Sequence, residues 1–148
     1  MLRYFSDRIA FKDQALKVNL ERLQDAWEDY QSSRDRDGVY GYLSAVFELV
    51  TWWARYDIAK EYAHRAMCVK AARPVEHVPE PFAAIIFSTA DPQKVDYRTR
   101  SKWSRALRYA AKFKRRREAL ASFMKRKGGI NRCALRFARR LGRHASQT

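Results

Sequence analysis

The sequence has few of the features that identify a disulfide-bonded protein, a membrane protein or a secreted protein. Its two cysteines, Cys68 and Cys133, lie far apart and fall on the apolar sides of predicted helices, so we expect no disulfide framework. No uncharged run approaches the roughly 20 apolar residues of a membrane-spanning helix. The N-terminus also lacks the apolar segment and small-residue cleavage site of a signal peptide. We therefore expect a soluble, cytoplasmic protein with no membrane partner.

The common motifs of catalysis are absent as well. The sequence contains no Gly-x-Ser-x-Gly, no His-Glu-x-x-His and no Gly-rich phosphate loop followed by Lys. Glu61, His64 and Cys68 follow one another along a predicted helix, but a carboxylate-bridged metal site needs a second such set, which is missing. Neighbouring arginines would lower the pKa of the Cys133 thiol, yet no histidine is placed as its base. We expect no enzyme activity, no metal and no cofactor.

Acidic residues are scarce in the second part of the chain. The whole sequence carries a net charge of +15, and from Gln93 onward 19 Lys or Arg stand against two acids, Asp96 and Glu118. Residues 1–92 hold the other 12 Lys or Arg and 14 acids, so that part is close to neutral. Such asymmetry indicates a polyanionic partner, nucleic acid first and an anionic membrane second. Arg outnumbers Lys in the basic part by 13 to six, which suits bidentate contacts with phosphate and guanine.

Apolar spacing predicts an all-α protein that begins with an antiparallel helical hairpin. A first amphipathic helix is expected over residues 5–32, and a second, far more apolar helix over residues 39–71. The short connection between them favours direct packing, which makes residues 1–73 a packing or pairing element. If the hairpin cannot cover both Trp52 and Trp53, the excess apolar surface marks a homodimer interface.

A proline-rich segment follows the hairpin. All four prolines lie between residues 74 and 92, which predicts a linker or domain boundary over residues 74–97. Within it, residues 81–89 suit either a short helix with Pro81 at its first position or a short buried strand. We choose the helix, because no second strand pattern is available to pair with.

The remaining segment, residues 98–148, is predicted to be a small basic helical bundle. Apolar periodicity indicates helices over residues 98–114, 118–127 and 130–141, with Gly128-Gly129 ending the second of them. The last helix should turn its apolar stripe inward, including Phe137 and Leu141. Two helices joined by a short glycine turn also permit a helix-turn-helix interpretation, in which the last helix enters a groove of DNA.

Basic residues line the faces opposite the predicted apolar stripes. The last helix contains no acid, so its arginine row costs stability unless something negative is nearby. Tyr109 lies among the basic residues of its helix, where it would stack on a base or lie against a sugar. Arg116 joins this face if the helix continues through Arg117. The candidate nucleic-acid-binding residues are Arg98, Lys102, Arg105, Tyr109, Lys112, Arg116, Arg132, Arg136, Arg139 and Arg143.

These features favour a small DNA-binding protein, a transcription regulator or accessory factor that contacts phosphates through arginine-rich helix faces. An RNA-binding or ribonucleoprotein component is the first alternative, because it would use the same arginines on a different groove geometry. The second alternative is an adaptor whose basic part docks an acidic protein and has no nucleic-acid role. Each of these functions needs the arginine row to lie outside the hydrophobic core.

Overall fold

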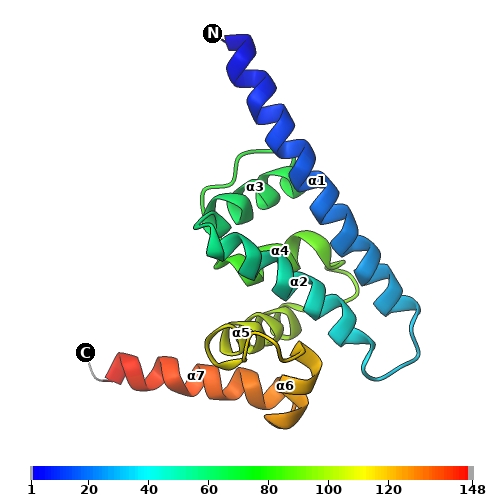
Figure 1. The fold of residues 1–148 in the computed structure, drawn as a ribbon, viewed down its shortest axis with the longest axis vertical. Coiled ribbons are helices and arrows are strands. Elements are labelled where there is room, and N and C mark those ends of the chain that lie inside the picture. Colours follow the sequence, from blue (N-terminus) through cyan, green and yellow to red (C-terminus); the bar gives the residue numbers. More distant parts are fainter. Residues whose placement is uncertain (1, 147–148) are drawn as a thin grey trace.

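The chain folds into helices, as the apolar spacing predicted. The computed structural model describes the backbone of residues 2–146 and the side chains of residues 14–142. Over this part of the chain there are seven helices and no strand (Figure 1). None of the described helices combines the length and apolar character needed to cross a membrane.

The predicted hairpin is formed by α1 (Leu2–Ser32) and α2 (Gly38–Arg55). The apolar face of α1 is buried at Leu16, Leu20, Leu23 and Trp27, which recur at steps of three or four residues. On α2, Trp53 is buried, whereas the neighbouring Trp52 is 49 % exposed. The hairpin and its neighbours therefore cover only one of the two adjacent tryptophans.

The second predicted helix proves to be two helices, so the prediction of one continuous element is wrong. The chain breaks after α2 and resumes as α3 (Ala59–Ala71), because Asp57 takes the left-handed conformation with φ 57°. The amides of Asp57 and Ile58 donate to the carbonyls of Ala54 and Trp53, both at 3.1 Å, which is the pattern of a Schellman helix end. Aspartate tolerates this conformation better than most residues, so no glycine or proline marks the break.

Residues 74–97, predicted to be a linker with a short helix, contain a helix that is buried in the core. This helix, α4 (Pro81–Thr89), confirms the choice of helix over strand and has Pro81 in its first turn. The Glu80 carboxylate caps it by accepting hydrogen bonds from the amides of Phe82 at 3.0 Å and Ala83 at 2.6 Å. Burial raises the pKa of Glu80, while these two hydrogen bonds act in the opposite direction. Helix α4 contacts α1, α2, α3 and α5.

The basic part consists of α5 (Tyr97–Phe113), α6 (Leu120–Arg126) and α7 (Ile130–Ser146). Asp96 caps α5, with its carboxylate accepting the amide of Thr99 at 2.8 Å. The two glycines after α6 have φ values of 100° and 102°, which confirms the predicted glycine turn. Helix α7 continues to Ser146, beyond its predicted end at residue 141.

One hydrophobic core joins the near-neutral and the basic parts of the chain. The Trp103 ring of α5 lies with its centroid 6.2 Å from that of Trp27 on α1 and 6.3 Å from that of Tyr42 on α2. The Tyr42 hydroxyl is within 2.6 Å of the Thr89 hydroxyl, in a buried hydrogen bond that ties α2 to α4. The segments 1–73, 74–97 and 98–148 therefore differ in charge but do not have separate cores.

Candidate nucleic-acid interface

The basic surface is built where α7 packs along α5. Helix α5 lies between α2 and α7 (Figure 1), and α7 contacts only α5 and α6 among the helices of the described chain. Phe137 is 3 % exposed at this contact. The Arg108 guanidinium lies 4.5 Å from the centroid of its ring, and the Lys112 ammonium lies 5.9 Å from it. Packing on Phe137 thus brings two cations of α5 to the α7 side of the molecule.

Arginines on the outer side of α7 continue this surface. Arg132 and Arg139 are exposed, and Arg136 is half-buried. Arg136, Arg139 and Arg140 line a hollow of about 230 Å³ together with Tyr109 of α5. A second hollow, of about 340 Å³, is lined by Arg132, Leu135, Arg136 and Arg139. We call this set the α5–α7 basic surface; it comprises Arg108, Lys112, Arg132, Arg136, Arg139 and Arg140.

Aromatic rings hold two of these guanidiniums in place. Arg140 lies 4.2 Å from the ring centroid of Phe113, and Arg108 lies over Phe137 as described above. A guanidinium that is stacked on a ring keeps its N–H groups free along its edges. Because the side chain is already restricted, less conformational entropy is lost when those N–H groups bind an anion.

The ion pairs of the protein lie away from this surface. Glu118 binds Arg126 with two hydrogen bonds of 3.0 and 3.1 Å, and this contact lowers the pKa of the Glu118 carboxyl. Asp37, from the loop between α1 and α2, pairs with Lys125 at 2.6 Å. Within residues 14–142, the third and last ion pair joins Arg65 to Glu61. The α5–α7 basic surface therefore carries no ion pair among the described side chains.

The other predicted site residues are only partly brought together with this surface. Arg98, Lys102 and Arg105 lie in the first half of α5, and Arg98 is about 21 Å from Lys112 along the helix axis. Arg105 is half-buried and its Nε donates to the Ser101 carbonyl at 3.3 Å. Arg116 lies in a loop, because α5 ends at Phe113. The side chain of Arg143 lies outside the described residues.

Tyr109, which was expected to stack on a base or lie against a sugar, is largely buried. Its ring is only 6 % exposed and packs on Phe113 and Phe123, with centroid distances of 4.8 and 5.8 Å. The periodicity of α5 alone placed Tyr109 on a solvent-facing side, but α6 and α7 cover that side in the structure. The reverse holds for Leu141, which was expected to turn inward and is 46 % exposed.

Sequence reasoning missed Arg108 and Arg140 as members of the surface. Both lie at the border of an apolar stripe, where the guanidinium of an arginine can lie against an aromatic ring. That position is the only signal in the sequence that would have indicated them.

The side chains considered above for metal binding or catalysis have structural surroundings. His64 Nε2 lies 2.7 Å from the Val75 carbonyl, and Glu61 forms the ion pair with Arg65. Burial raises the pKa of the Cys133 thiol and outweighs the lowering by Arg136, which corrects the expectation of a lowered pKa. No group of three or more potential metal ligands is found among the described residues.

Comparison with protein-family models, with curated proteins and with solved structures finds no match for this chain. Inference about its function therefore depends on the surface itself.

Proposed function

We propose that the chain binds duplex DNA through the α5–α7 basic surface and acts as a regulator or accessory factor. The observation that carries this proposal is the convergence of six cations, from two helices, on one surface where none has an ion-pair partner among the side chains of residues 14–142. Like charges this close destabilise one another, and a row of phosphates would relieve that repulsion.

The position of α7 favours duplex DNA over duplex RNA. Helix α7 spans 17 residues, about 25 Å in length, and contacts only α5 and α6 among the helices of the described chain. The DNA major groove, about 12 Å wide, admits an α-helix, whereas the deep and narrow major groove of A-form RNA does not. Helices α6 and α7 with their glycine turn would then act as a helix-turn-helix-like unit.

One apolar side chain on the outer side of α7 fits such a groove position. Leu135 is 50 % exposed and lies in the same hollow as Arg132 and Arg139. An apolar side chain between arginines can contact a thymine methyl group while the arginines contact phosphate or guanine. Pairing of two copies through the hairpin stays part of this proposal, and the exposed Trp52 on α2 and Tyr56 directly after it are the side chains that would support it.

The contribution of single arginines tests the mode of binding. If Arg139 contacts a phosphate, Arg139→Ala weakens binding to unrelated duplexes equally and reduces the slope of log affinity against log salt by about 0.9. If Arg139 reads a base, the loss is about 1–3 kcal/mol on a preferred site and small on random DNA. Fluorescence anisotropy at several salt concentrations measures both quantities.

Arg22→Ala is the matched control, because Arg22 is an exposed arginine on α1. It removes the same charge and should leave the slope unchanged. Equal effects of the two substitutions would mean that only net charge matters. Stronger competition by structured RNA than by duplex DNA would favour the RNA-binding alternative.

A further inference from the structure

A cationic cleft lies between α2 and the loop that joins α5 to α6. Its volume is about 400 Å³, and its charged lining consists of Arg55, Lys114, Arg116, Arg117, Glu48 and Glu118. Arg55 belongs to the near-neutral part of the sequence, about 60 residues before the loop arginines. The charge asymmetry of the sequence therefore gives no reason to include it in a nucleic-acid interface.

Two of the charged groups in this cleft are already bound within the protein. The Lys114 ammonium donates to the carbonyls of Arg115 at 2.9 Å and Glu118 at 2.7 Å. The Glu118 carboxylate is occupied by Arg126, as described above. The exposed guanidiniums of Arg55, Arg116 and Arg117 then face a single remaining acid, Glu48. The cleft thus keeps an excess of positive charge.

The polar groups of the cleft match the chemistry of a phosphate. Arginine presents paired N–H donors to phosphate oxygens, and Ser44 adds a hydroxyl to the lining. The Thr51 hydroxyl donates to the Phe47 carbonyl at 2.7 Å, so its proton is already used. The donors that remain for an anion come from both sides of the cleft, from α2 and from the loop.

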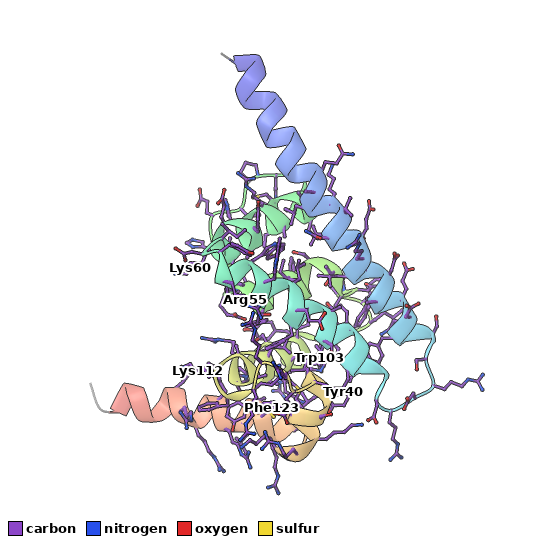
Figure 2. All side chains as sticks on the ribbon, in the orientation of Figure 1. Tyr40, Arg55, Lys60, Trp103, Lys112 and Phe123 are labelled. Atoms are coloured by element: carbon purple, nitrogen blue, oxygen red, sulfur yellow. The ribbon has the colours of Figure 1, made fainter. Side chains whose placement is uncertain are left out.

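The cleft adjoins the end of α5 that carries the α5–α7 basic surface. Lys112 belongs to that surface, and Lys114, two residues later, lines the cleft. In the view of Figure 2, Lys112 lies between Arg55 and α7. A nucleic-acid backbone that follows the arginines of α7 past Lys112 would reach the cleft next.

We propose that this cleft binds a phosphate group of the same nucleic acid, with Arg55 as its contact from the N-terminal part of the chain. This inference rests on the proposed function, because the phosphate is taken to belong to the bound nucleic-acid backbone. It adds a binding residue that neither the charge distribution nor the arginine row of α7 indicates.

The test is a salt titration of duplex DNA binding by full-length Arg55→Ala, Arg55→Lys and Arg22→Ala proteins. Loss of one phosphate contact should reduce the slope of log affinity against log salt by about 0.9 in Arg55→Ala. Arg55→Lys should keep most of the slope, since it keeps the charge, and Arg22→Ala should keep all of it. Thermal melts of each variant establish that the comparison is between folded proteins.

Other outcomes overturn the inference in distinguishable ways. An unchanged slope in Arg55→Ala, in a protein whose binding still depends on the α7 arginines, rejects the cleft but leaves the proposed function in place. A parent protein that does not bind nucleic acid rejects both. A second arm titrates inorganic phosphate into the full-length protein and follows its melting temperature. If phosphate raises the melting temperature of the parent but not of Arg55→Ala, while the DNA salt slope of Arg55→Ala is unchanged, the cleft is a site for free phosphate instead.

Discussion

Replacing Arg132, Arg136, Arg139 and Arg140 together by alanine should lower the affinity for duplex DNA by roughly 10³-fold at 0.1 M salt. Each phosphate contact releases about 0.9 counterion, so four lost contacts also reduce the salt slope by about 3.6. The fold should survive, because alanine favours a helix and the buried face of α7, with Cys133 and Phe137, is unchanged. Affinity is measured by anisotropy, and folding by circular dichroism.

A second quadruple variant separates the surface from net charge. It removes four exposed cations from α1, α3 and the segment after α3, namely Lys17, Arg22, Lys70 and Arg73. Both variants have the same net charge, but the second should keep nearly all of the affinity and slope. A folded α7 variant with an unchanged salt slope would exclude this helix from the interface, and the first half of α5 with Arg98, Lys102 and Arg105 would be the remaining candidate.

Trp103→Ala should lower the free energy of unfolding by about 3–5 kcal/mol, as expected for loss of a buried tryptophan. Trp103 is 6 % exposed, and its ring lies 6.2 to 6.3 Å from those of Trp27, Tyr30 and Tyr42. Because these rings belong to α1, α2 and α5, the change weakens the core that both parts of the chain share. Urea denaturation followed by circular dichroism measures the loss.

The same denaturation experiment tests whether the chain unfolds as one unit. A shared core predicts a single transition that coincides for circular dichroism and for the fluorescence of the tryptophans that remain. Trp52→Ala is the matched control, since Trp52 is 49 % exposed and should cost far less stability. Two separate transitions, or a Trp103→Ala protein as stable as the parent, would show that the hairpin and the basic helices fold independently.

The helices could be predicted closely because their signals are local. The steps of three and four residues in α1, the Asp96 cap and the glycine pair after α6 each depend on neighbouring residues only. The break between α2 and α3 could not be predicted, since it depends on Asp57 taking a left-handed conformation without a glycine. The central position of α4 was not predicted, because the prolines in and around this helix suggested a linker. An apolar helix of nine residues must nevertheless bury its surface against other elements.

Only those features of the candidate site that depend on a single helix could be predicted from the sequence. The arginine row of α7 follows from its own periodicity, and Arg132, Arg136 and Arg139 do lie on its solvent side or its border. The periodicity of one helix does not indicate which other helix packs against it. The packing of α7 on α5 buries Tyr109, brings Arg108 and Lys112 around Phe137, and leaves Leu141 exposed.

The most direct test of the proposed function is a titration of the full-length chain against duplex DNA at salt concentrations between 50 and about 300 mM. If the six cations of the α5–α7 basic surface contact phosphates, log affinity should fall linearly with log salt, with a slope of about −5. A folded protein that does not bind duplex DNA at the lowest salt concentration, or binds it with a slope near zero, would contradict the central claim.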